Sequence, residues 1–431
     1  MHSVSKNLSA WVATHLLPKQ KLIVAYSGGR DSHVLLDALV RLKAEYDFQL
    51  TAIHVNHGLQ KDAPQWAAHC QKWCDTYDIS LKVINLSFNV KKGESLEEQA
   101  RLNRYQALEA HVLENDLLLT AHSQDDQAET FLLQLMRGSG IKGLASIAPL
   151  KRFSKGYLAR PLLNVCRGDI ADYASEHKLC WIEDPSNQNL SLRRNFVRHQ
   201  ILYPLEKLHQ NVSVCISRSA KHCAHALSLL EDYLEQDLVP CLGDVPHTLN
   251  ITVLKQHSPI KQAYLFRLWL SKHQVALPNE RKCEDMLKQL FCAAPDASPQ
   301  ITLGTHQLRR YQQFIYILSS GSLPITKATS WDLQAPIKLA DGAKWQAKVK
   351  KGRGLSKCKL HNQSVSVEYR ELRPSKKLKK IFQSHQIPPW ERQSIPLFYV
   401  GSALVGVGSL YLCKAWQVEK PEEEGIFFEK I

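Results

Sequence analysis

Six consecutive residues with the sequence SGGRDS follow an apolar run near the start of the chain and combine two hydroxyls, two glycines and a carboxylate. Adjacent glycines let the backbone approach an anion closely, and the amides of a turn that opens a helix attract phosphate. A carboxylate repels phosphate, so we predict that Asp31 holds Mg²⁺ against it. The residues predicted to bind the phosphates are Ser27, Gly28, Gly29, Arg30, Asp31 and Ser32.

This turn differs from the G-x-x-x-x-G-K-[ST] phosphate loop because no lysine follows the glycines. The alternative interpretation is an ordinary strand-to-helix turn in which the aspartate caps the helix. Turn geometry alone does not need both serines. The phosphate interpretation therefore explains more of the segment.

Alternating strand-like and helix-like runs surround this turn in about the first 200 residues. This order predicts an α/β fold with a doubly wound, mostly parallel, Rossmann-like sheet. Ligands of such sheets bind beyond the carboxyl ends of the strands. AYSGGRDS, IHVNHGL and LTAHSQDDQ each end a strand-like run, so we expect them to share one cleft. The strand-like runs are Lys21–Tyr26, Leu50–Val55, Leu81–Leu86 and Asp116–Thr120, and the helix-like runs are Asp31–Tyr46, Ala63–Tyr77, Ser95–Glu114 and Gln124–Arg137.

The chain is too long for one compact core, and we expect two smaller C-terminal domains after the sheet. Patterning predicts the sheet domain over residues 1–213, a helical linker over 214–248, a small α/β domain over 249–320 and a basic, β-rich domain over 331–431. The stretch 319–330 has the composition of a linker.

Basic residues exceed acidic ones, 55 to 41, and give a net charge of +14. Such an excess indicates a polyanionic partner, most simply nucleic acid. Between residues 350 and 392, twelve basic residues stand against three acidic ones, with aromatic side chains among them, as in RNA-binding surfaces. A solvated basic face is the alternative. The densest cluster is Lys376, Lys377, Lys379 and Lys380.

Eleven scattered cysteines without a C-x-x-C pair predict reduced thiols rather than disulfides or an iron–sulfur site. Cys70 and Cys74, with the histidines before them, do not have a familiar zinc-ligand spacing. No apolar run of 18 residues and no signal-peptide core occur. We therefore expect a cytoplasmic protein with no membrane partner.

The strand–SGGxDS–helix pattern resembles the pyrophosphate loop of the N-type ATP pyrophosphatases, the PP-loop superfamily. Further motifs resemble the tRNA(Ile)-lysidine synthetase family and follow its order along most of the chain. The family usually has two adjacent histidines where this chain has His122 and Ser123, so we infer that Ser123 occupies a replaceable position. The matching motifs are HVNHGL (54–59), EEQARLNRY (97–105), TAHSQDDQAETFLLQLMRGSGIKGL (120–144), RPLL (160–163), IEDPSNQNLSLRRNFVR (182–198) and IPPWERQSIPLFY (387–399).

The resemblance implies an ATP-dependent ligase. ATP, with Mg²⁺, would adenylylate the C2 oxygen of the wobble cytidine of an isoleucine tRNA with a CAU anticodon. The ε-amino group of free L-lysine would then displace AMP, which gives lysidine and changes decoding from AUG to AUA. Free lysine has a pKa of about 10.4, so the site must help to remove a proton. The oligomeric state stays open, with a homodimer as one option.

The resemblance also places the catalytic residues. Asp125 and Glu129 are four apart and share a helix face, and His122 lies near Asp126. Carboxylates there would bind Mg²⁺ or the incoming ammonium group and accept its proton. The alternative is that both acids cap the helix. We predict Asp31, Asp125, Asp126 and His122 as catalytic residues.

Several basic positions match the family's binding motifs. Arg101 and Arg137 are predicted to bind ATP, while Arg194 and Asn195, with the four lysines of residues 376–380, are predicted to bind tRNA. Arg101 also forms an i, i+4 pattern with Glu97 that is common on helix surfaces, and Arg194 also fits a solvated helix end. The histidines of HVNHGL either border the adenine or complete a turn.

Two other functions fit parts of the sequence. The first is tRNA thiolation by the same loop chemistry, which needs a persulfide cysteine or a cluster site, and the C-x-x-C pair is missing. The second is non-catalytic RNA binding on a nucleotide-binding fold. The intact loop and paired aspartates argue against a decayed site.

Overall fold

The computed structural model describes residues 3–56, 63–86, 96–245, 247–294, 297–319, 328–339, 342–360, 363–369 and 376–431. The chain divides into two compact units, Met1–Tyr233 and Leu234–Ile431. Each unit is described by itself. Within the described residues, no helix is long and apolar enough to cross a membrane.

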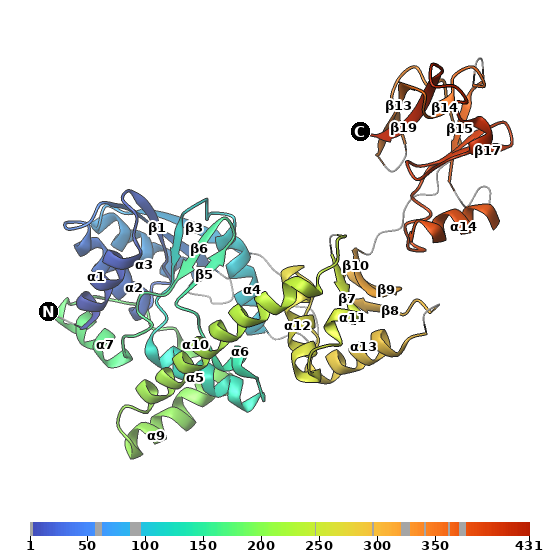
Figure 1. The fold of residues 1–431 in the computed structure, drawn as a ribbon. Helices are drawn as coiled ribbons and strands as arrows, with labels where there is room; N and C mark the ends of the chain where they lie inside the picture. Colours follow the sequence, from blue (N-terminus) through green and yellow to red (C-terminus); the bar gives the residue numbers. More distant parts are fainter. Residues whose placement is uncertain are drawn as a thin grey trace. The chain divides into compact units, whose positions relative to one another are not determined.

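A six-stranded sheet forms the centre of the first unit (Figure 1). Its order is β3-β2-β1-β4-β6-β5, and every neighbouring pair is parallel except β5 with β6. This confirms the predicted doubly wound, mostly parallel sheet. The β5–β6 hairpin was not expected, because its short strands carry little apolar periodicity. The strands are β1 Gln20–Ala25, β2 Phe48–Asn56, β3 Ser80–Asn85, β4 Leu117–Leu119, β5 Leu150–Phe153 and β6 Gly156–Ala159.

Helices cover both faces of this sheet because alternate residues of β1 point to opposite sides. Leu22 and Val24 join a core with helices α1, α2, α3 and α7, whereas Ile23 joins a core that includes Leu108 of α4. The sequence predicted α2 to α5 to within a few residues where they are described. The helices are α1 Ser3–His15, α2 Arg30–Leu42, α3 Ala63–Thr76, α4 Leu96–Glu109, α5 Gln124–Met136, α6 Ile141–Leu144 and α7 Arg167–Glu176.

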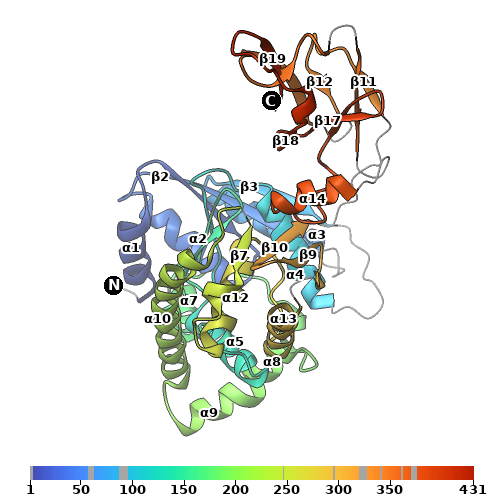
Figure 2. The same ribbon diagram turned by 45° about the vertical axis from the view of Figure 1, so that its right-hand side comes forward.

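A helical segment closes the first unit and leads into the second. It contains α8 Arg193–Phe196, the π-helical turn Val197–Leu202, α9 Tyr203–Leu208 and the long helix α10 Val212–Leu238. Val197 and Leu202 pack against Ala128 of α5. This contact fixes the segment beside α5, as Figure 2 also shows.

The second unit begins with a four-stranded antiparallel sheet in the order β7-β10-β9-β8. The sequence predicted both longer helices and the strands β8 and β10, but it did not predict β7 or β9. Arg309 and Arg310 interrupt the apolar pattern of β9. The elements are β7 Thr248–Asn250, α11 Ile251–Leu254, α12 Pro259–Lys272, α13 Glu280–Cys292, β8 Gln300–Leu303, β9 His306–Tyr311 and β10 Phe314–Ser319.

The described part of the remainder is β-rich and contains two sheets and one α-helix. Trp331, Phe398 and Phe428 belong to one core shared by the sheets. The helix α14 Lys376–Ser384 buries Leu378 and Phe382. Most of the expected linker 319–330 lies outside the described residues. The strands are β11 Thr329–Trp331, β12 Ile337–Lys338, β13 Lys344–Lys351, β14 Leu355–Ser356, β15 Val365–Glu368, β16 Leu397–Val400, β17 Ala403–Val407, β18 Tyr411–Leu412 and β19 Glu424–Lys430.

Candidate active site

The SGGRDS turn connects the carboxyl end of β1 to the start of α2. Gly28 has φ +83°, a left-handed conformation that favours glycine, and Gly29 is the N-cap of α2. The Oγ atoms of Ser27 and Ser32 lie 3.0 Å apart, and Ser32 Oγ donates to the carbonyl of Gly29 at 2.9 Å. The turn thus places two hydroxyls together at the amino end of a helix, where an anion is favoured.

Close packing holds this turn in place. The carbonyl of Gly28 accepts a hydrogen bond of 3.0 Å from the amide of Ile182. A Cβ atom on Gly28 would lie 2.9 Å from Cys70 Sγ and 2.9 Å from Ile182 Cδ1. Because real Cβ atoms do not approach other atoms this closely, only glycine fits. The turn therefore packs closely against both α3 and the segment around residue 182.

Asp31 lies in the first turn of α2 and is not its N-cap. Its Oδ1 accepts from Nε of Arg30 at 3.2 Å, and both side chains are 27% exposed. The described residues contain no group of three or more His, Cys, Asp or Glu side chains placed to hold a metal ion. Mg²⁺ is often bound by one or two carboxylates together with substrate phosphates, and this turn offers that arrangement.

The second predicted motif begins α5, immediately after β4. Ser123 is the N-cap, and its Oγ and backbone amide form a capping box with Asp126. The amide of Ser123 donates to Asp126 Oδ2 at 2.8 Å, and the amide of Arg167 donates to Asp125 Oδ2 at 2.7 Å. Both aspartates thus have structural partners, and Ser123 caps the helix.

Three arginines enclose two carboxylates on α5. Glu129 is fully buried, and its Oε2 and Oε1 accept from Nε of Arg194 at 2.7 Å and from Nε of Arg198 at 2.6 Å. Asp126 Oδ1 accepts from Nη2 of Arg194 at 2.8 Å. Arg167 is 3.5 Å from an oxygen of each acid. We call Asp126, Glu129, Arg167, Arg194 and Arg198 the arginine–acid cluster.

The charges within this cluster shift the pKa values of Asp126 and Arg167. Burial raises the pKa of Asp126, but Arg194 and Arg167 outweigh burial and hold that pKa below its usual value. Burial lowers the pKa of Arg167, but the acids around it raise it by more, and Asp31 is among them. Arg167 therefore interacts electrostatically both with Asp31 of the SGGRDS turn and with the acids of α5. Of the three motifs predicted to share one cleft, the two that follow the neighbouring parallel strands β1 and β4 lie at the same edge of the sheet, whereas residues 57–59 of the third lie outside the described residues.

His122 lies at the edge of this group, with Nδ1 2.9 Å from Thr120 Oγ1. Burial lowers the pKa of His122 to about 3, although Asp126 acts in the opposite direction. The ring is consequently neutral near pH 7. A group with such low basicity orients a ligand by hydrogen bonding better than it removes a proton from an ammonium group.

Further cations come from α4. The guanidinium carbons of Arg101 and Arg104 lie 5.2 and 5.9 Å from the ring centroid of Tyr105. Burial lowers the pKa of Arg104, and its like-charged neighbours Arg101 and Arg194 lower it further. This concentration of positive charge favours a bound anion such as a nucleotide or an RNA phosphate.

The structure does not bring every predicted residue to this site. Arg137 follows the last residue of α5, about 18 Å along the helix from Asp125 at 1.5 Å per residue. Asn195 is buried, and its Nδ2 donates to the carbonyls of Ser186 and Asn189 at 2.9 and 3.0 Å. Its amide thus supports a neighbouring loop. His57 and the side chain of Glu97 lie outside the described residues.

Sequence reasoning missed two members of the arginine–acid cluster as site residues, Arg167 and Arg198, and named Glu129 only as a carboxylate on the same helix face as Asp125. Two spacings carried a signal. Glu129 is three residues after Asp126, and Arg198 is four after Arg194, so each pair shares a helix face. Arg167 carried no such signal because its partners are about 40 residues away.

His54 completes a buried contact behind the turn. Its Nδ1 lies 3.0 Å from the carbonyl oxygen of Tyr26 and 3.4 Å from Cys70 Sγ. Burial lowers the pKa of His54, so the ring is neutral. Of the two roles considered, the observed contacts match the completion of the turn.

The predicted basic cluster lies on α14. Lys376, Lys377, Lys379 and Lys380 are all exposed, on the side of the helix opposite its buried residues. Nζ of Lys377 lies 5.7 Å from the ring centroid of Tyr411. The helix therefore presents a compact basic surface to solvent.

Family models cover three parts of the chain. A PP-loop domain matches residues 1–205, a TilS substrate binding domain matches 249–316, and a TilS substrate C-terminal domain matches 359–427. The PP-loop match agrees with the six-stranded sheet and the SGGRDS turn.

Curated relatives match along nearly the whole chain. The tRNA(Ile)-lysidine synthase of Coxiella burnetii is 37% identical and covers 96% of this chain and 93% of its own length. Those of Vibrio vulnificus strain YJ016 and Methylococcus capsulatus are 38% and 36% identical, each over 91% of this chain and 92% of their own length. A solved U34-tRNA thiolase, NcsA from Methanococcus maripaludis, is 22% identical with a TM-score of 0.45 and covers 51% of this chain and 77% of its own.

Proposed function

The chain belongs to the tRNA(Ile)-lysidine synthase family, and from that premise we propose how its residues carry out the reaction. The enzyme uses ATP to convert the wobble cytidine of an isoleucine tRNA with a CAU anticodon to lysidine. The observation that carries this proposal is the convergence of the SGGRDS turn and the arginine–acid cluster in one unit. Thiolation is not favoured, because the curated relatives that match nearly the whole chain are tRNA(Ile)-lysidine synthases.

In the first step, the SGGRDS turn binds the pyrophosphate part of ATP. The hydroxyls of Ser27 and Ser32 and the amides at the start of α2 donate to phosphate oxygens. Asp31 would hold Mg²⁺, whose charge stabilises the pyrophosphate leaving group. The C2 oxygen of cytidine attacks the α-phosphorus, and pyrophosphate leaves. The C2 oxygen leaves readily only after this conversion to a phosphate ester.

In the second step, free L-lysine displaces AMP from C2. Asp125 is the acid best placed to bind the ammonium group of lysine. Its side chain is half-buried, and its hydrogen bond from the amide of Arg167 uses only Oδ2. Asp126 is more fully committed to Ser123 and the arginines. The surplus of guanidinium groups neutralises the adenylyl phosphate and RNA phosphates nearby.

The other assignments complete this proposal. We assign catalysis to residues 1–213, a helical connection to 214–248, substrate binding to 249–320, and tRNA binding to the basic domain 331–431. The cytoplasm is the proposed location, since scattered thiols without a C-x-x-C pair suit a reducing compartment. The decisive experiment incubates the protein with ATP, labelled lysine and the tRNA transcript. Label should appear at the wobble cytidine and should require all three components.

Asp125→Ala should separate the two steps. Loss of a charge-assisted hydrogen bond to the ammonium group should raise the lysine concentration needed for half-maximal ligation about tenfold. Formation of adenylylated tRNA without lysine should change little. The matched variant Asp172→Ala removes an exposed acid of α7. Equal lysine dependence in wild type and Asp125→Ala would show that Asp125 only supports the amide of Arg167.

Replacing Lys376, Lys377, Lys379 and Lys380 together with Gln should weaken tRNA binding and leave ATP affinity unchanged. Each lost phosphate contact should reduce the slope of log K against log salt by about 0.7 to 0.9. A fourfold Lys→Arg variant keeps the charge and should keep the slope. Activity on a short anticodon stem-loop should fall much less than activity on full tRNA. Equal losses on both substrates would mean that α14 is only a solvated face.

A further inference from the structure

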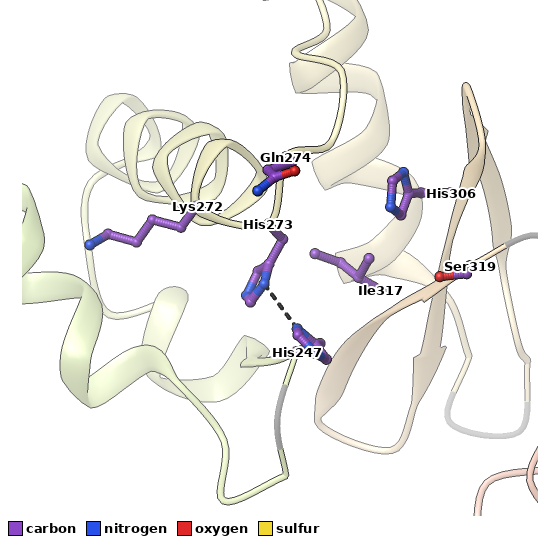
Figure 3. A pocket seen from close by; sticks show the side chains of 7 residues that line it. All are labelled: His247, Lys272, His273, Gln274, His306, Ile317 and Ser319. Atoms are coloured by element: carbon purple, nitrogen blue, oxygen red, sulfur yellow. Dashed lines mark hydrogen bonds between the residues drawn. The ribbon is translucent and has the colours of Figure 1, made fainter. Parts of the chain in front are cut away.

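A hollow of about 260 Å³ lies in the second unit, between the end of α12 and the sheet β7-β10-β9-β8. Figure 3 shows its lining, which combines three imidazoles with an amide, a hydroxyl and one apolar side chain. None of the seven lining residues that the structure describes is acidic. They are His247, Lys272, His273, Gln274, His306, Ile317 and Ser319.

Two of the imidazoles are joined. Nδ1 of His247 lies 2.9 Å from Nδ1 of His273, and the two rings stand at 76°. Such a bond needs one protonated and one unprotonated Nδ1. Burial lowers the pKa of His273, and His247 lowers it further, which keeps this ring neutral. A neutral His273 whose Nδ1 accepts in this pair carries its proton on Nε2 and can donate there, and one whose Nδ1 donates can accept at Nε2.

The backbone fixes both rings before any ligand binds. His247 has φ +61°, and its carbonyl accepts from the amide of Ile317 at 3.1 Å. His273 is the C-cap of α12. His247 thus lies at the edge of a sheet and His273 at the end of a helix. Little conformational freedom remains for a ligand to remove.

The lining restricts the chemical class of the ligand. A metal ion is a poor match, because the Nδ1 atoms of the pair bind each other and no metal-holding group of three occurs among the described residues. The ammonium of Lys272 is 2.7 Å from Glu235 Oε1 and extends away from the histidines in Figure 3. Imidazole rings, the apolar side chain of Ile317 and the polar groups of Gln274 and Ser319 suit a flat, hydrogen-bonding base.

We propose that this hollow binds one unpaired nucleotide of the tRNA substrate. Its volume suits a single base and not a duplex, and RNA-binding proteins read unpaired bases by stacking and edge hydrogen bonds. The surrounding domain model is described as substrate binding. This inference rests on the proposed function and adds to it a nucleotide site outside the unit that carries the catalytic cleft.

Tests of this site use His247→Asn and His306→Gln in the full-length protein. Asparagine tolerates the left-handed backbone at position 247 and removes the imidazole. Each variant should bind the tRNA about 5- to 20-fold more weakly, the effect of one lost base stack. His225→Asn, an exposed change on α10, should bind as wild type. Modification of a short anticodon stem-loop should be unchanged in all three.

Two results would overturn the proposal. One is wild-type tRNA affinity in both His247→Asn and His306→Gln. The other is a result in which inorganic phosphate binds the wild-type protein but not the two variants, while all three proteins bind tRNA equally. That result would identify a small-anion site. Failure of the proposed function looks different, because the wild-type protein would then form no lysidine on any substrate.

Discussion

Asp31→Asn should abolish formation of adenylylated tRNA while tRNA binding stays near wild type. Asparagine keeps the size of the side chain but removes the charge proposed to hold Mg²⁺ beside the SGGRDS turn. Loss of such electrostatic stabilisation typically costs on the order of 100-fold or more in rate. Pyrophosphate release in the presence of tRNA, measured over a Mg²⁺ titration, reports this step directly.

The control for this result is Asp172→Asn, which removes an exposed acid of α7 and should keep full activity. Thermal unfolding of Asp31→Asn should match wild type, because Asp31 is not the N-cap of α2 and its side-chain hydrogen bond among the described residues goes to the neighbouring Arg30. Wild-type turnover of Asp31→Asn at saturating Mg²⁺ would refute the metal assignment. Asp31 would then be only an acidic residue at the start of α2.

The sequence predicted the parts of the fold that depend on local patterns. Apolar runs of period two and helical faces identified β1 to β4 and α2 to α5. The motifs at the strand ends predicted that three of them meet, and the structure places those after β1 and β4 at one edge of the sheet. The β5–β6 hairpin escaped, because Lys151, Arg152 and Ser154 obscure any apolar alternation. Strand β9 escaped for a similar reason, since Arg309 and Arg310 occupy its centre.

Partners that are distant in the sequence could not be predicted from local patterns. Asp126 and Glu129 looked like acids free to meet a substrate, but the structure surrounds them with guanidinium groups from residues 167, 194 and 198. Burial of a carboxylate requires such compensation, yet the sequence does not state which arginines supply it. Tertiary structure therefore changes the interpretation of Asp126 from a substrate ligand to a cap and ion-pair partner, while its catalytic role stays a prediction.

Glu129→Gln should be the most destabilising single change near the site. Glu129 is fully buried and accepts from Arg194 and Arg198, with Arg167 also nearby. Removing one charge of a buried, paired group leaves its partners uncompensated and costs about 3 to 5 kcal/mol. Urea unfolding of the full-length protein, monitored by circular dichroism, should show this loss of free energy of unfolding. Glu45→Gln, an exposed change after α2, should leave the midpoint unchanged.

Acid should weaken the same cluster in the wild-type protein. Arg194 and Arg167 hold the pKa of Asp126 below its usual value, so its ionised form is favoured in the folded state. The resulting stabilisation is complete above the unfolded pKa, about 3.9, and is lost as pH falls through the lowered folded value. Asp126 is present in the Glu129→Gln variant too, so the variant's free energy of unfolding should also fall over this pH range. It should start from a lower value than that of wild type, because the substituted side chain carries no charge. Equal unfolding midpoints for wild type and Glu129→Gln near neutral pH would show that the arginines find other partners and that the buried charge is not needed to hold them.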